Sequence, residues 1–227
     1  QEQVDNSRAR YGKTPVEHLN ELGVFDHPTI AAHALALMPE DIRILAEKNV
    51  TVARTPITYM KLAMPVRTPV THLLNAGFTR VALGSDGPAS NADLDMLAVI
   101  RQQVLLEKYT QENPEALPGD TALRMATQNG ARAMNFADSG VLAVGRPADL
   151  ILINFDRPHL RPRHDLIANL VHSAKAADVT HVIVDGKLIM RDRILLTLDE
   201  ERILYEAERR AFRMVSQNMN QIREYQG

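Results

Sequence analysis

The feature that most constrains the fold is an alternation of short apolar segments with helical segments over the first 138 residues. Three segments have the apolar or β-branched composition of strands, and they read TIAAHALAL (29–37), VTVAR (50–54) and RVALG (80–84). Helical periodicity follows each of them, at 41–48, 70–76 and 94–108, and a further helix is expected at 121–135. Alternation of this kind is typical of a parallel α/β fold.

Three strand–helix units are too few to close a barrel. A (β/α)₈ TIM barrel needs eight units and typically about 250 residues, whereas an open parallel sheet of three strands would leave long unpaired edges. We therefore expect residues 1–138 to be the C-terminal part of a TIM barrel. Ahead of the first strand, residues 4–23 are expected to form two helices, the second of which begins at Thr14-Pro15 and ends at Gly23.

The pattern changes near residue 139. Residues 139–197 contain two strand-turn-strand segments, and Asp185-Gly186 is a typical hairpin turn, so we expect part of a small β-sandwich module there. Residues 198–227 are expected to form a highly charged amphipathic C-terminal helix.

Composition excludes several classes of function. The chain has no cysteine, so it can contain neither disulfides nor thiolate metal ligands. Its 26 basic and 28 acidic residues give a net charge of −2, which argues against nucleic acid as a partner. No run of about 18 apolar residues is present, so no membrane contact is expected. These properties fit a cytoplasmic protein.

Two polar residues occupy positions where parallel α/β folds usually build active sites, at the ends of strands. His33 lies in the first apolar segment, and Asp86 follows the third directly, in GSDGPASN. Taken singly, His33 is also compatible with a hydrogen-bonded core histidine, and Asp86 with a helix cap or an Asx-turn. Together on one sheet, they indicate a candidate site.

Six segments, in order along nearly the whole chain, carry a resemblance to a known family: YGKTPVEHLNELG (11–23), AAHALALMPEDIRILAEKNV (31–50), MKLA (60–63), ALGSDGPASNADLDML (82–97), ATQNGARAM (126–134) and VGRPADLILIN (144–154). The chain resembles the metal-dependent amidohydrolase superfamily, and within it the branch of 5-methylthioadenosine/S-adenosylhomocysteine deaminases and chlorohydrolases. The resemblance implies a hydrolase acting on a C–N bond of a purine- or pterin-like heterocycle, a barrel represented here by strands six to eight, and a homo-oligomer.

The resemblance also assigns roles to the two residues. Asp86 matches the family's aspartate that binds the catalytic metal and moves protons, and His33 matches the histidine that contacts the group under attack. One divalent metal ion, zinc or iron, is implied, and such an ion lowers the pKa of bound water toward 7.

The metal site expected from the resemblance is incomplete in this sequence. The chain has no His-x-His pair, and the family's His-x-x-Glu is expected just before Gln1. His18 and Glu21 form a literal His-x-x-Glu, but they lie in a segment where the family has a surface helix. We therefore expect the 227 residues to be inactive alone and to need the missing N-terminal part of the same protein. The alternatives are a triazine-type chlorohydrolase and a non-catalytic remnant that acts as a binding or assembly module.

Two positions depart from the adenosine-type pattern. Pro65 fixes the backbone in a stretch where the family has small residues. Arg54 ends the second predicted strand, where it could bind a carboxylate or phosphate-like group of the substrate or form a structural salt bridge.

Overall fold

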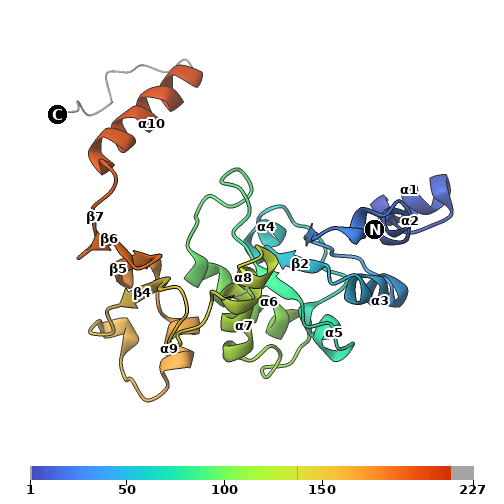
Figure 1. Ribbon diagram of the computed structural model, residues 1–227, viewed down its shortest axis with the longest axis horizontal. Coiled ribbons are helices and arrows are strands. Elements are labelled where there is room, and N and C mark those ends of the chain that lie inside the picture. Colours follow the sequence, from blue (N-terminus) through green and yellow to red (C-terminus); the bar gives the residue numbers. More distant parts are fainter. Residues whose placement is uncertain (1, 137, 216–227) are drawn as a thin grey trace. The chain divides into compact units, whose positions relative to one another are not determined.

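A computed structural model describes residues 2–136 and 138–215 (Figure 1). The chain divides into two compact units. The first unit comprises residues 1–146 and 155–178, and the second comprises residues 147–154 and 179–227. No helix in the described part of the chain is long and apolar enough to cross a membrane.

A parallel sheet forms the centre of the first unit. Its strands β1 (Ile30–Ala32), β2 (Thr51–Arg54) and β3 (Val81–Leu83) follow one another in the order β1-β2-β3. Both pairings are parallel, and Ala53 on β2 lies opposite Ala32 on β1 and Ala82 on β3. The α/β alternation predicted from the sequence is confirmed.

The expected strand over residues 29–37, whose continuous apolar sequence is typical of a strand buried on both faces, is wrong in length and in burial. β1 has only three residues, and Ile30 keeps 43% of its surface exposed. The strand stops because His33 and Ala34 adopt positive φ angles of 67° and 48°, which end the extended conformation. β1 is an edge strand of this sheet, so one side of its backbone is unpaired within the described residues.

The N-terminal helices form where the sequence predicted them. α1 (Glu2–Tyr11) is followed by α2 (Pro15–Glu21), and Gly23 then takes a left-handed φ of 74°. Thr14 caps α2: its hydroxyl accepts from the Glu17 amide at 3.1 Å, and its own amide donates to the Glu17 carboxylate at 2.7 Å.

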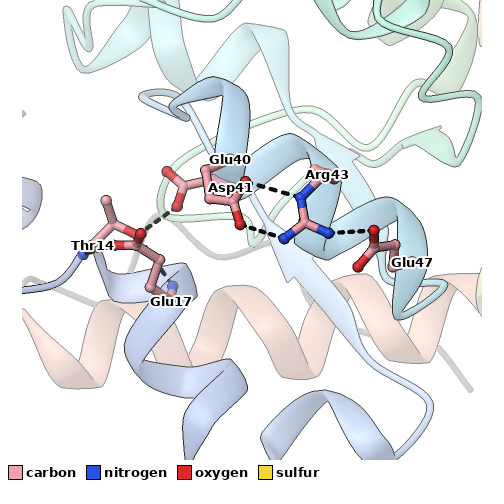
Figure 2. A network of polar contacts seen from close by, with 6 residues as sticks. All are labelled: Thr14, Glu17, Glu40, Asp41, Arg43 and Glu47. Carbon is pink, nitrogen blue, oxygen red and sulfur yellow. Dashed lines mark hydrogen bonds and ion pairs between the residues drawn. The ribbon is translucent and has the colours of Figure 1, made fainter.

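A polar network connects α2 to the next helix, α3 (Pro39–Glu47). Figure 2 shows the Thr14 hydroxyl donating to the Asp41 carboxylate. The second Asp41 oxygen accepts from the Met38 amide at 2.8 Å. Further along α3, Arg43 pairs with Glu40 and Glu47 on the exposed surface. The buried Asp41 thus caps α3 and fixes it to α2.

Helices cover the rest of the first unit: α4 (Pro56–Lys61), α5 (Val70–Asn75), α6 (Met96–Thr110), α7 (Gly119–Ala126), α8 (Gln128–Ala133) and α9 (Leu166–His172), with 3₁₀ turns at Val24–Asp26, Pro158–Leu160 and Ala176–Asp178. The single helix expected over 121–135 is broken at Thr127, whose ψ of −89° departs from helical geometry. Residues 155–178 belong to this unit because α9 packs against α6 and α7.

The second unit contains an antiparallel sheet of β4 (Leu150–Ile153), β5 (Val179–Val184), β6 (Lys187–Arg191) and β7 (Ile194–Leu195), in that order. The hairpin predicted at Asp185-Gly186 is confirmed, and both residues have the positive φ angles that a type I′ turn requires. The strand expected before the turn at 145–149 does not form: residues 140–144 are not a strand, and Gly140 and Gly145 take positive φ angles.

The C-terminal helix is α10 (Glu200–Met214), as expected, although residues 216–227 of the predicted helix lie outside the described residues. The described strands of this unit form one sheet, so the second layer of a β-sandwich stays a prediction. The domain boundaries expected at 138 and 197 also stay a prediction.

Candidate active site

The two residues singled out in the sequence lie at the carboxyl ends of parallel strands. His33 directly follows β1, and Asp86 comes three residues after β3 ends at Leu83. Between these strands runs β2, which is followed by Thr55 and the first turn of α4. Since parallel strands end at the same edge of a sheet, the topology brings these three strand ends together.

Both residues have an unusual backbone conformation. The φ angle is 67° at His33 and 65° at Asp86. Both values lie in the left-handed region, which residues other than glycine rarely adopt. The backbone hydrogen bonds between the strands continue to this edge of the sheet. The His33 amide donates to the Ala53 carbonyl at 2.8 Å, and the Gly84 amide donates to the Arg54 carbonyl at 2.9 Å. Strained non-glycine residues of this kind cluster at functional sites.

The Asp86 carboxylate is fixed by two hydrogen bonds. Oδ1 accepts from the Gly87 amide at 2.7 Å, and Oδ2 accepts from the Thr58 hydroxyl at 3.0 Å. The Gly87 hydrogen bond is the main reason why the pKa of Asp86 lies below its usual value. Burial opposes it with the second largest effect, and Thr58 and His33 add weaker effects that lower the pKa. Asp86 is therefore an oriented, half-buried anion, suited to bind a cation or to accept a proton.

The His33 imidazole is held from two sides. Its Nδ1 lies 3.1 Å from the Thr55 hydroxyl oxygen, and its ring meets the Tyr59 ring edge-on, with 5.8 Å between centroids. The ring is only half-buried, so the imidazole is oriented by the protein and open to a small molecule.

Arg54 does not occupy the position expected of a substrate ligand. Only 1% of its surface is exposed. Its Nη1 donates to the carbonyls of His33 at 2.8 Å and Ala34 at 3.3 Å, and its Nη2 donates to the Thr68 carbonyl. This arrangement favours a structural role over contact with a substrate anion. Arg54 donates hydrogen bonds to the carbonyls of the two left-handed residues that end β1. The partners are carbonyl groups, not the acidic side chain of a salt bridge.

The described residues do not make a complete metal site. They contain no group of three or more His, Asp or Glu side chains placed to hold a metal ion, whereas catalytic zinc usually takes three protein ligands and a water. Asp86 and His33 together offer two donors at most. His18 stacks on Tyr11 at 4.0 Å and Glu21 pairs with Lys13 at 2.5 Å, which agrees with the surface-helix interpretation of that His-x-x-Glu.

Sequence analysis missed Thr55, Thr58 and Tyr59, the residues that orient His33 and Asp86. The available signal was their position, since Thr55-Pro56 follows a predicted strand and begins a helix at the same edge of the sheet. The contact between Thr58 and Asp86 spans 28 residues and leaves no local pattern.

Comparison with known proteins gives a consistent result. A family model described as the amidohydrolase family matches residues 1–189. Two similar proteins are both named 5-methylthioadenosine/S-adenosylhomocysteine deaminase. The one from Pelotomaculum thermopropionicum is 50% identical over 95% of this chain and 49% of its own length, and the one from Dictyoglomus thermophilum is 45% identical over 95% and 50%.

Solved structures agree with this. An adenosine deaminase from Xanthomonas campestris with bound zinc has a TM-score of 0.89 and 33% identity, over 95% of this chain and 49% of its own. The atrazine chlorohydrolase TrzN from Arthrobacter aurescens TC1, complexed with zinc, has a TM-score of 0.80 and 25% identity, over 91% and 46%. The chain thus spans about half the length of the relatives it matches.

Proposed function

We propose that this chain, which belongs to the amidohydrolase family, supplies strands six to eight of the barrel of a hydrolytic deaminase. The substrate would be a heterocycle of the purine type, and the reaction would replace its exocyclic amine with oxygen. One observation carries the proposal: His33 and Asp86 stand in left-handed conformations at the carboxyl ends of parallel strands, in a chain that is 50% identical to a protein named a deaminase.

Each residue has a role that its contacts support. Asp86, whose pKa is lowered chiefly by the Gly87 amide, would be ionised at neutral pH. It would take a proton from the attacking water and help to deliver it to the departing ammonia. His33 would donate a hydrogen bond to the group on which charge develops.

A divalent metal belongs to the proposal, with zinc favoured over iron because the similar structures of the adenosine deaminase and of TrzN contain zinc. Asp86 would be one of its ligands. The described residues cannot complete the ligand set, so the proposal takes the other ligands from outside them, in a segment N-terminal to Gln1. The cytoplasmic location and the homo-oligomeric state stay predictions.

Two other functions remain open to test. A triazine-type chlorohydrolase is favoured by the likeness to TrzN, although the identity to that protein is only 25%. A non-catalytic remnant is favoured by the incomplete set of metal donors within the described residues. The 50% identity to a deaminase places the first proposal ahead of both.

The test compares the 227-residue chain with the same chain extended by the sequence that precedes Gln1 in its gene. Both receive zinc, then 5′-methylthioadenosine or a chlorinated triazine, and the release of ammonia and of chloride is measured. We expect ammonia from the extended protein and none from the 227 residues alone. Chloride release would favour the chlorohydrolase, no product from the extended protein would favour the remnant, and ammonia release by the 227 residues alone would refute the need for further ligands.

A further inference from the structure

Among the described residues, the hydroxyl of Thr55 is the only group that hydrogen-bonds to the His33 ring, at 3.1 Å from Nδ1. A neutral imidazole carries its proton on one nitrogen only, and the partner of one nitrogen decides which. We propose that Thr55 is a positioning residue that donates its hydroxyl proton to Nδ1 of His33 and thereby keeps the imidazole proton on Nε2.

Thr55 is itself rigidly held. It is 6% exposed, and its amide donates to the Tyr59 hydroxyl at 2.8 Å. Tyr59 is 2% exposed, and its ring packs edge-on against the His33 ring. The segment from Arg54 to Tyr59 therefore contacts His33 at its carbonyl, at Nδ1 and on its ring. The imidazole cannot turn away from Thr55 without losing the contacts at Nδ1 and on the ring.

The direction of the hydrogen bond follows from counting protons. A threonine hydroxyl has one proton, which needs an acceptor when the residue is buried. In the described part of the chain, the Thr55 hydroxyl has no second hydrogen-bond partner. If Nδ1 carried the proton and donated it to Thr55, the hydroxyl proton would have no acceptor. An unprotonated Nδ1 accepts the hydroxyl proton of Thr55, so the hydroxyl and the Nδ1 atom both have a hydrogen-bond partner. The ring proton then resides on Nε2.

The assignment of the imidazole proton to Nε2 specifies how His33 would act in the proposed function, and it rests on that proposed function. The role proposed for His33 requires a donor, and Nε2–H is the donor that this arrangement provides. Within the described residues, Nε2 has no hydrogen-bond partner of its own, so it is available to a substrate. In this proposal Thr55 acts only through His33, which makes it a positioning residue.

The experiment is a two-dimensional ¹⁵N–¹H NMR measurement of histidine tautomers on the metal-free 227-residue chain, at alkaline pH where imidazole is neutral. The His33 signals are assigned with H33Q. Thr55→Val keeps the shape of the side chain and removes the hydroxyl, whereas Thr55→Ser keeps the hydroxyl. The matched control is Thr110→Val, because Thr110 is exposed on α6 and its hydroxyl donates to the Leu106 carbonyl at 2.8 Å.

We expect the parent, T55S and T110V proteins to hold His33 in the Nε2–H form. In T55V, the ratio of Nε2–H to Nδ1–H should fall about five-fold, the factor that one neutral hydrogen bond supports. A parent protein with the proton on Nδ1 would overturn the inference without any variant, and so would a T55V spectrum that matches the parent. The NMR readout needs no turnover, so failure of this inference and failure of the proposed deaminase are separate results.

Discussion

The two units of this chain use their sheets differently. In the first unit, the sheet is deeply buried at β2 and β3: Val52 on β2 and Val81 on β3 show no exposed surface. Polar side chains at the strand ends bond to residues far away in sequence. In the second unit, the strands remain half exposed, with Ile151 and Leu152 each at 47%, and Met190, at 8%, is the one buried strand residue among those described.

This difference shows where a precise site can be built. A buried sheet fixes the backbone at its edge, so strained residues such as His33 and Asp86 are held by many surrounding contacts. The second unit has positive φ angles as well, but there they serve turns, as at Asp185 and Gly186. Similar backbone angles therefore indicate a candidate active site in one unit and a hairpin in the other.

The largest expected effect comes from truncating one apolar residue in each unit. Leu73 on α5 is fully buried and Ile151 on β4 is about half exposed. Leu73→Ala should therefore cost about 2–5 kcal/mol, and Ile151→Ala under about 1 kcal/mol. Urea unfolding followed by circular dichroism measures both, and equal losses would contradict the contrast between the two units.

A smaller difference is expected at two glycines with similar φ angles. A Cβ at Gly140, where φ is 84°, would lie 2.7 Å from the Gln128 Cα, whereas a Cβ at Gly186, where φ is 73°, would meet nothing within 4 Å. Gly140→Ala combines a clash with backbone strain and should cost roughly 2–4 kcal/mol. Gly186→Ala carries the strain alone, about 1–2 kcal/mol.

Thermal unfolding of the two glycine variants gives the comparison directly, with the parent chain as the reference. Gly140→Ala should have the lower melting temperature. If Gly186→Ala were the less stable variant, the second unit would be packed more tightly around its turn than the structure shows.

The smallest effect is a pH dependence assigned to the first unit. Burial, with Lys108 and Arg101 nearby, lowers the pKa of His172 below its usual value, against a weaker effect of Asp165. The folded state then disfavours the protonated ring, whereas the unfolded chain takes up this proton freely. The free energy of unfolding is therefore highest above a pH of about 6.5 and decreases as the pH falls below it. His172→Gln should flatten the change in urea midpoint between pH 7.5 and 5.5, and equal slopes in parent and variant would contradict this.

Much of the fold was predictable because its signals are local. Thr14-Pro15, Gly23 and Asp185-Gly186 mark element ends through their own backbone preferences, and the structure confirms each of them. The length of β1 was not predictable, because its end at His33 depends on Arg54, which lies 21 residues further along the chain. An apolar sequence such as TIAAHALAL does not reveal that contact.

The candidate site was predictable in part for the same reason. His33 was found within a predicted strand and Asp86 directly after one, and both match family motifs. Thr55 and Thr58 act through side chains that reach 22 and 28 residues away, and no periodicity indicates such contacts. Arg54 was open to two interpretations, a substrate ligand or a structural salt bridge. A sequence does not show which groups surround an arginine at the end of a strand.

The most direct test of the account compares two aspartates that share a left-handed backbone, Asp86 with a φ of 65° in the first unit and Asp185 with a φ of 49° in the second. Each is changed to asparagine in the zinc-loaded protein extended upstream of Gln1, and ammonia release from 5′-methylthioadenosine is measured. The account predicts that Asp86→Asn lowers the rate by about 10²–10⁴-fold, while Asp185→Asn leaves it unchanged. Full activity in Asp86→Asn, or an equal loss in both variants, would contradict the assignment of the chemistry to the edge of the parallel sheet.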